Sequence, residues 1–206
     1  MEVIEYQTGP LRVNTYLVYD ETKEAFLVDP GSYLKQISNN VASKELDLKY
    51  IVLTHGHGDH IGGIRQFKAD FPDIKVVALE EEKATLNDSV LNNSKILLGG
   101  EVTMDADLYV HDGETLVVGN MNLKFLATPG HTPGGMSILL DDVVFCGDTL
   151  FKGSIGRSDM PGGDYLALID SIKTKLFTLP DDTKVYPGHM YNTTIGWEKK
   201  HNPFVD

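Results

Sequence analysis

Residues 50–60 of the chain read Tyr50-Ile51-Val52-Leu53-Thr54-His55-Gly56-His57-Gly58-Asp59-His60. The first four residues are apolar or aromatic, which predicts a buried strand, and the polar residues follow directly where that strand ends. Side chains two residues apart in an extended segment point the same way. We therefore expect His55, His57 and Asp59 to project from one side, with His60 at the start of the next helix. Four potential metal ligands lie within six residues.

Three further candidate ligands lie on turns that end other predicted strands. They are His131, Asp148 and His189, and each directly follows a glycine. Imidazole nitrogens and carboxylate oxygens suit a borderline divalent cation such as zinc. One ion would be saturated by the first segment alone, so seven ligands predict two divalent metal ions if one carboxylate bridges them. We expect zinc, with iron or manganese as alternatives, because these metals accept the same ligands.

Single members of this ligand set also have other interpretations. Asp59 could cap the helix that begins at His60, since aspartate is favoured at that position. His131 or His189, taken alone, could be a loop histidine satisfied by hydrogen bonds. Histidines spaced by two and three residues on glycine-containing turns after strands are hard to explain by packing, and this pattern favours the metal site.

The composition restricts the class of protein. The 206 residues carry a formal net charge of −12, which disfavours nucleic acid as a partner because phosphate binding needs a basic surface. No stretch approaches the roughly 18 apolar residues of a membrane helix, and no secretion signal begins the chain, so we expect no membrane partner and a cytoplasmic location. Residues 1–206 are expected to form one domain. The single cysteine, Cys146, is predicted to be a buried apolar residue outside the ligand set, and His111 and His201 are predicted to be solvated.

Apolar runs alternate with helical patterns in the first half, which predicts α/β layers. We expect strands over residues 16–19, 25–28, 50–53 and 74–79, and helices over 33–41 and 61–71. Residues 80–106 are polar and are predicted to form a helical or loop excursion over one edge. From residue 108 the pattern predicts a meandering sheet, with strands over 115–118, 122–127, 136–140 and 143–146. A helix over 164–179, a strand over 184–186 and a polar tail from Asn192 complete the prediction.

The pattern Thr-His-x-His-x-Asp-His in residues 54–60 resembles the signature of the metallo-β-lactamase superfamily. His131, Asp148 and His189 follow in that family's order. Within the superfamily, residues 128–135, 147–159, 161–164 and 186–189 resemble the type II glyoxalases, which are hydroxyacylglutathione hydrolases, and their shorter relatives. The resemblance implies an α/β fold, an αββα sandwich of two mixed β-sheets flanked by helices, with the metal site at one edge of the sheets.

The resemblance also implies roles for individual residues. The first metal would be held by His55, His57 and His131, and the second by Asp59, His60 and His189, with Asp148 bridging the two. Asp59 would also be catalytic, because it would orient the bridging hydroxide. Arg157 lies where relatives place a basic side chain near the thiol substrate, although it could simply pair with Asp159 or Asp164. Asp29 resembles a turn residue that supports a ligand histidine from behind, although Asp before Pro-Gly is also a plain turn signal.

The expected function is hydrolysis of small acyl thioesters, with S-lactoylglutathione or a similar compound as substrate. Two ions that share a water lower its pKa toward 7, and the resulting hydroxide attacks the thioester carbonyl. Full-length glyoxalases of this type continue into a helical domain that grips glutathione, and this chain stops first, so the identity of the thiol is left open. Alternatives are a mononuclear iron persulfide dioxygenase, a lactone or β-lactam hydrolase, and a non-catalytic metal-binding scaffold. A nuclease is disfavoured by the acidic charge.

Overall fold

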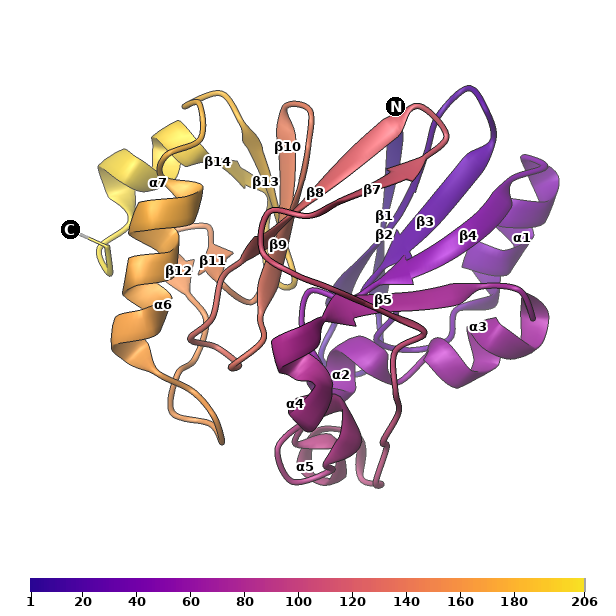
Figure 1. Cartoon of the computed structure of the whole chain (residues 1–206), viewed down its shortest axis with the longest axis horizontal. Helices are drawn as coiled ribbons and strands as arrows, with labels where there is room; N and C mark the ends of the chain where they lie inside the picture. Colours follow the sequence, from indigo (N-terminus) through magenta and orange to yellow (C-terminus); the bar gives the residue numbers. More distant parts are fainter. Residues whose placement is uncertain (206) are drawn as a thin grey trace.

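Two six-stranded β-sheets packed face to face form the centre of the structure, a computed structural model that describes residues 1–205 (Figure 1). Helices cover the outer side of each sheet, so the layers run helix, sheet, sheet, helix. Both sheets mix parallel and antiparallel strands. The αββα sandwich predicted from the sequence is confirmed.

The first sheet contains strands from the first half of the chain. In spatial order they are β1 (Glu2–Thr8), β2 (Val13–Tyr19), β3 (Glu24–Val28), β4 (Asp47–Val52), β5 (Lys75–Leu79) and β6 (Leu108–Val110). Strands β1 to β3 pair antiparallel, and β3 to β6 pair parallel. Parallel neighbours need crossover connections, and the helices in those crossovers cover the outer face of this sheet.

The second sheet is a meander with one parallel addition. Its spatial order is β14 (Thr193–Thr194), β13 (Lys184–Pro187), β10 (Val143–Gly147), β9 (Met136–Leu140), β8 (Met121–Ala127) and β7 (Thr115–Val118). Strands β7 to β10 follow one another antiparallel, and β13 lies parallel to β10 after a helical crossover. The predicted meander is confirmed, although β6 pairs with β5 and so belongs to the first sheet.

Helices and short elements fill the connections. They are α1 (Lys35–Ser43), α2 (Gly58–Ile61), α3 (Ile64–Asp70), the 3₁₀ turn η1 (Glu80–Glu82), α4 (Lys83–Asn87), α5 (Ser94–Leu98), α6 (Tyr165–Ser171), the π-helical turn η2 (Ile172–Leu176) and α7 (Ile195–His201). A small separate hairpin consists of β11 (Leu150–Phe151) and β12 (Ser154–Ile155). No helix within residues 1–205 has the length and apolar character needed to cross a lipid bilayer.

Alternation along the strands explains the four layers. In β3, Ala25 and Leu27 pack toward the helices, whereas Phe26 and Val28 pack toward the second sheet. Successive side chains of a strand point to opposite faces, so a strand that is apolar on both faces must lie between two layers. The space between the sheets is filled from both sides, for example by Phe125 and Phe145 of the second sheet.

The predicted helix over residues 61–71 is interrupted. The amide of Gly63 donates to the carbonyl oxygen of Pro30 at 2.9 Å instead of to the preceding helical turn, and α2 therefore ends before α3 begins. This break places the loop after β3 directly against the segment that carries the candidate ligands.

Several elements were not predicted, including the short strands β6, β11, β12 and β14, the seven-residue strand β1 and the helix α7. Strand β1 was missed because only one face of it is buried, and α7 was missed because the tail from Asn192 is polar. Helix α7 is capped by the side chain of Thr194, which accepts a hydrogen bond from the amide of Trp197 at 3.2 Å, and it is anchored by the buried Ile195.

Candidate metal centre

The seven predicted ligands come together at one edge of the two sheets. His55 and His57 follow β4, and Asp59 and His60 lie in α2. Three further loops supply the others: His131 lies between β8 and β9, Asp148 between β10 and β11, and His189 after β13. The first sheet thus provides four of the residues and the second sheet provides three.

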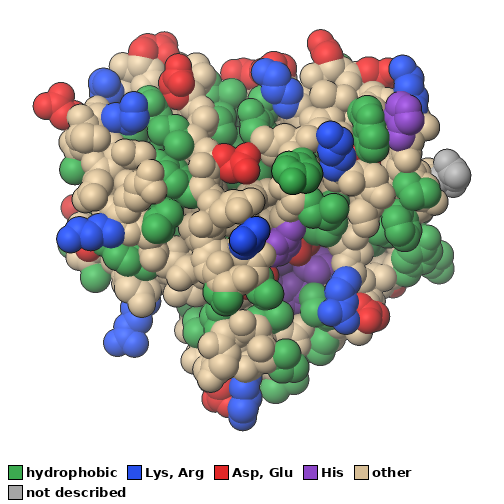
Figure 2. All heavy atoms as spheres, turned by 180° about the vertical axis from the view of Figure 1, so that it is seen from behind, with side chains coloured by type: hydrophobic (Ala, Val, Ile, Leu, Met, Phe, Trp, Pro, Cys, Tyr) green, Lys and Arg blue, Asp and Glu red, His purple; other side chains and the backbone are tan. Residues whose placement is uncertain are grey.

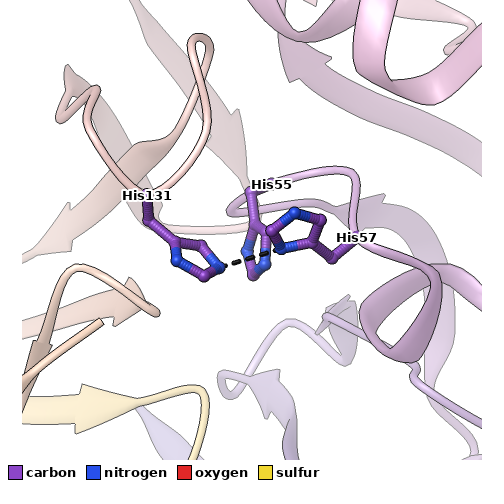
Figure 3. A group of neighbouring side chains, drawn as sticks. All are labelled: His55, His57 and His131. Carbon is purple, nitrogen blue, oxygen red and sulfur yellow. Dashed lines mark hydrogen bonds between the residues drawn. The ribbon is translucent and has the colours of Figure 1, made fainter. Parts of the chain in front are cut away.

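One group contains His55, His57 and His131, each less than 5% exposed. One ring nitrogen from each lies within 4.8 Å of the other two, and Nδ1 of His57 lies 2.9 Å from Nε2 of His131. Figure 3 shows the three rings turned toward one another, with His131 reaching in from a different loop. Three nitrogens at this spacing could hold one divalent cation.

A second group contains Asp59, His60 and His189. Oδ2 of Asp59 lies 3.4 Å from Nε2 of His189 and 3.9 Å from Nε2 of His60. His60 is fully buried, whereas the side chain of His189 is 22% exposed. This group therefore lies nearer to the surface opening.

Asp148 lies between the two groups. Its Oδ2 is 3.6 Å from Nε2 of His131 and 3.6 Å from Nε2 of His189, and its Oδ1 is 3.5 Å from Nε2 of His60. A single carboxylate thus faces histidines of both groups, which is the arrangement required of a bridging ligand. Nothing larger than glycine fits at position 188 beside it, because a Cβ there would lie 2.3 Å from Oδ1 of Asp148.

Hydrogen bonds behind the rings orient three of the histidines. Nδ1 of His131 donates to the carbonyl oxygen of Arg157 at 2.6 Å, and Nδ1 of His60 donates to Oδ2 of Asp29 at 2.9 Å. The hydroxyl of Thr54 gives its proton to Asp29 at 2.6 Å, so it accepts from Nδ1 of His55 at 3.1 Å. In each ring Nε2 is left to face the centre.

Several buried polar atoms at the centre have no hydrogen-bond partner within the described chain. They include Nε2 of His55, His57 and His60, and Oδ1 of Asp148. Buried polar atoms are nearly always paired, because leaving one unpaired costs about 1–3 kcal/mol. Unpartnered atoms gathered at one point, all of them metal-ligating types, fit a site for cations.

Asp29 ties this centre to the loop after β3. Its Oδ1 accepts from the amide of Thr54 at 2.8 Å, and its Oδ2 accepts from Thr54 and His60. The backbone at Asp29 has a positive φ of 47°, a strained conformation for a residue other than glycine. One carboxylate oxygen of Asp29 also lies within 4.8 Å of a ring nitrogen of His55 and of a ring nitrogen of His60, so these three residues could hold a cation. Because both of its oxygens already accept hydrogen bonds, its geometry suits the support of His60 better than direct metal binding.

The pKa values of the clustered histidines show that the carboxylates of the centre favour a positive charge at His60. Burial, reinforced by the neighbouring His60, holds the pKa of His55 well below its usual value, and burial together with His131 lowers the pKa of His57 to about 3. Burial opposes protonation of His60 as well, but Asp148, Asp59 and Asp29 outweigh it and raise the pKa of His60 to about 10. A cation binding at Nε2 of His60 would take over the role of this proton.

A cavity of about 330 Å³ opens beside the second group. Asp59, Asp148, His131 and His189 form its floor, and its walls carry Leu11, Leu97, Phe151, Ile155, Met160 and Arg157. Figure 2 shows histidine side chains at the bottom of a hollow that hydrophobic side chains surround. A larger groove of about 580 Å³ lies between α2–α3 and residues 101–105, and none of the candidate ligands lines it.

Arg157 lies at the rim of the cavity and is exposed. Its guanidinium makes a two-pronged ion pair with Asp159, with N–O distances of 2.8 and 2.9 Å. Of the two partners considered for Arg157 from the sequence, Asp159 forms the ion pair. Asp164 does not, because its side chain caps the N-terminus of α6. The ion pair is exposed on both sides, so it can exchange for a ligand at little cost.

Asp59 does not cap α2: the capping position is His57, and Asp59 lies within the first turn, because the helix already begins at Gly58. The alternating extended pattern therefore ends at His57. His111 and His201 are exposed and lie outside the cluster, as predicted, and Cys146 is fully buried.

Asn14 is a positioning residue that the sequence pattern did not single out. Asn14 is fully buried in β2, and its amide nitrogen donates to the carbonyl oxygens of Pro187 and Met190 at 3.1 and 3.0 Å. These two carbonyls flank the turn that carries His189. The available signal was a polar residue two positions before the apolar run of residues 16–19.

Comparison with known proteins places the chain in a family. A family model described as the metallo-β-lactamase superfamily matches residues 8–189. The chain is 38% identical to hydroxyacylglutathione hydrolase GloC from Haemophilus influenzae over 94% of this chain and 92% of that protein. It is 37% identical to the BLEG-1 B3 metallo-β-lactamase, with a TM-score of 0.92 and 99% of both chains covered. TTHA1623, solved in a di-iron-bound form, is 32% identical with a TM-score of 0.86, and 98% of this chain and 100% of that chain are covered.

Proposed function

Because the chain belongs to the metallo-β-lactamase superfamily, we propose that it is a metal-dependent hydrolase of small acyl thioesters. The observation that carries this proposal is the position of the ligand cluster at the floor of an apolar cavity of about 330 Å³. A cavity of this size admits a small acyl group, and similarity to a hydroxyacylglutathione hydrolase supports a thioester as the reacting bond.

Two divalent ions would be held by the two groups, with His55, His57 and His131 on one, Asp59, His60 and His189 on the other, and Asp148 between them. When bound, such ions lower the pKa of a water toward 7 and polarise a substrate carbonyl. Zinc fits the nitrogen-rich donor set, and similarity to a protein solved with two irons makes iron the first alternative.

The protein side chains would position the reactants. Asp59 lies in the cavity floor and is 8% exposed, so its carboxylate can accept a hydrogen bond from a water and orient that water toward the substrate. Burial tends to raise the pKa of Asp59, but His60 and His189 pull it well below its ordinary value, so this carboxylate stays charged. Asp29 would hold the ring of His60 in place. A thiolate leaves without a strong general acid, so no protein proton donor is needed.

The cavity walls indicate what the substrate looks like. Five apolar side chains would contact the body of the substrate, and Arg157 is the one cationic side chain among the lining residues. We therefore propose that Arg157 binds a carboxylate on the thiol portion of the substrate, in exchange for its pairing with Asp159.

Arg157→Ala is expected to raise KM about 10-fold for thioesters whose thiol carries a carboxylate, because a charge-assisted hydrogen bond is lost. The kcat should stay within about twofold, since the side chain lies at the rim and not at the reacting carbonyl. Steady-state kinetics on paired substrates, one with an anionic thiol and one with a neutral thiol, provide the measurement. An equal rise in KM for the neutral thioester would contradict the proposed contact.

A panel of acyl thioesters tests the function itself. Protein with measured metal content is assayed for thiol release from S-lactoylglutathione and from neutral short-chain thioesters. Absence of hydrolysis across the panel would refute the proposal. Oxygen uptake with glutathione persulfide on the same sample tests the persulfide dioxygenase alternative, which requires iron and consumes oxygen, whereas hydrolysis consumes none.

A second candidate activity is ring opening of a β-lactam or a lactone. The specific observation in its favour is the TM-score of 0.92 to the BLEG-1 B3 metallo-β-lactamase, with 99% of both chains covered. A water activated by the same metal site could attack the carbonyl of a lactam, a lactone or a thioester. The residues that line the cavity would then determine which substrate is hydrolysed. Comparing kcat/KM for a β-lactam, a lactone and a thioester on one preparation would rank the candidates.

A further inference from the structure

A buried carboxylate lies behind the first ligand group and is not part of it. Glu82 closes the 3₁₀ turn η1, and its side chain is 1% exposed although two exposed glutamates precede it. Its Oε1 accepts from the amide of Gly56 at 2.7 Å. Its Oε2 accepts from the amide of Gly134 at 2.8 Å and from the hydroxyl of Thr132 at 3.0 Å.

The partners of Glu82 lie on the two loops that carry the first group. Gly56 lies between His55 and His57, on the loop after β4 of the first sheet. Thr132 directly follows His131, on the loop between β8 and β9 of the second sheet. Each carboxylate oxygen therefore holds one loop, and the side chain joins the two sheets directly behind their ligands.

We propose that Glu82 is a positioning residue that fixes the spacing between the loop of His55 and His57 and the loop of His131, and so sets the metal affinity of that group. This proposal rests on the metal-ligand assignment given under the proposed function. Residues that hold the ligands of a metal from behind are typically worth 10-fold to 100-fold in affinity when they are changed.

The chemistry of the contact favours a carboxylate over any other side chain. Two backbone amides and the hydroxyl of Thr132 donate to Glu82, the side chain of Thr85 adds a further hydrogen bond, and an ionised carboxylate is an acceptor at both oxygens. Burial raises the pKa of Glu82 to about 7, while the hydrogen bonds from Gly56, Thr132 and Gly134 favour its charged form. In glutamine, one oxygen would be replaced by an NH₂ group, which must face a donating amide. Glutamine can therefore satisfy one loop and not both.

The loop that carries His131 packs tightly against η1. A Cβ at position 134 would lie 2.0 Å from the backbone nitrogen of Glu82, so the loop of His131 is in direct contact with η1. A loop that loses its hydrogen bond here is expected to move away from the contact, and the ligand next to it moves with it.

The test measures metal binding in backgrounds that isolate each group. In a His189→Ala background, Glu82→Gln should weaken Zn²⁺ binding to the apoprotein 10-fold to 100-fold. In a His131→Ala background, which leaves the second group, the same change should alter the affinity less than about threefold. Isothermal titration with Zn²⁺ gives the dissociation constants, and circular dichroism verifies that each variant is folded.

A matched control is provided by Glu198, which is also 1% exposed and accepts hydrogen bonds at both carboxylate oxygens, in its case from one backbone amide and two side chains. Its partners are Gly153, Thr193 and Asn202, none of which lies on a ligand loop. Glu198→Gln should therefore leave the affinity of the first group within about threefold. If it weakens that group as much as Glu82→Gln does, the effect is general destabilisation and the proposal fails.

Thr132→Val keeps the test decisive if Glu82→Gln does not fold, because it removes one donor and leaves both backbone contacts. It should weaken the first group about 3-fold to 10-fold, as expected for one hydrogen bond. Unchanged affinity of the first group in the folded variants would overturn the proposal. These results do not depend on thioester hydrolysis: if the wild type binds two ions and hydrolyses no thioester, the function is refuted and the role of Glu82 still stands or falls on affinity.

Discussion

Removing the metal ions with a chelator is expected to lower thioester hydrolysis by at least about 10⁴-fold, to a rate close to the uncatalysed one. The physical reason is that the nucleophile would come from water whose pKa falls from 15.7 to about 7 only beside a metal ion. The residues that line the cavity include no serine or cysteine. Cys146 cannot substitute, because it is fully buried and burial raises the pKa of its thiol to about 12.

The measurement is kcat/KM of protein dialysed against a chelator, compared with protein to which zinc, iron or manganese has been returned. Recovery should reach full activity at two ions per chain, and the metal that restores most activity identifies the working ion. Circular dichroism before and after dialysis controls for unfolding. Hydrolysis that continues undiminished in metal-free protein would contradict the metal-dependent mechanism as a whole.

Asp148→Asn is expected to lower kcat/KM by about 10³-fold, equivalent to about 4 kcal/mol of transition-state stabilisation. Among residues 1–205, only Asp148 has oxygens at 3.5–3.6 Å from histidines of both groups. An amide keeps the size but removes the negative charge, and its NH₂ group would face ring nitrogens that have to ligate cations. Metal content should fall below two ions per chain at ion concentrations that saturate the wild type.

A matched control for this change is Asp142→Asn. Asp142 lies in the turn between β9 and β10, is exposed, and is paired with Lys184 at 3.6 Å, far from any ligand. Its replacement should leave both metal content and kcat/KM within about twofold, as is usual for surface positions. If Asp148→Asn retained two ions and near wild-type activity, the bridging role would be wrong.

The sequence predicted the fold well wherever apolar patterns were strong. The buried run of residues 25–28 in β3 and the run of residues 50–52 in β4 are apolar and short, and runs of this length bounded by turn residues favour a strand between two layers. It failed where local signals were weak. The break between α2 and α3 depends on the amide of Gly63 bonding to Pro30, and α7 depends on packing of a polar segment against the second sheet.

The candidate metal centre was likewise predictable from the sequence only in part. Residue types and spacing were sufficient to select the seven candidate ligands, because histidine and aspartate on glycine-containing turns after strands have few other uses. The residues that orient them were harder to find. Asn14 and Glu82 act across long sequence separations, and Glu82 lies in a run of three glutamates that resembles a solvated surface. Asp29 was noticed because its turn resembled a known one.

The sequence by itself determined the layered fold and selected the candidate ligands, because strand alternation, turn glycines and metal-ligand chemistry are all local properties of the chain. Residue patterns did not show how the candidate ligands divide into two groups or that Asp148 lies between them, which the family resemblance implied and the tertiary structure gives as distances, and only the structure revealed the contacts of Glu82 and Asn14. These depend on distances between loops of two different sheets. Such distances are set by the packing of the whole core, and no short stretch of sequence encodes them.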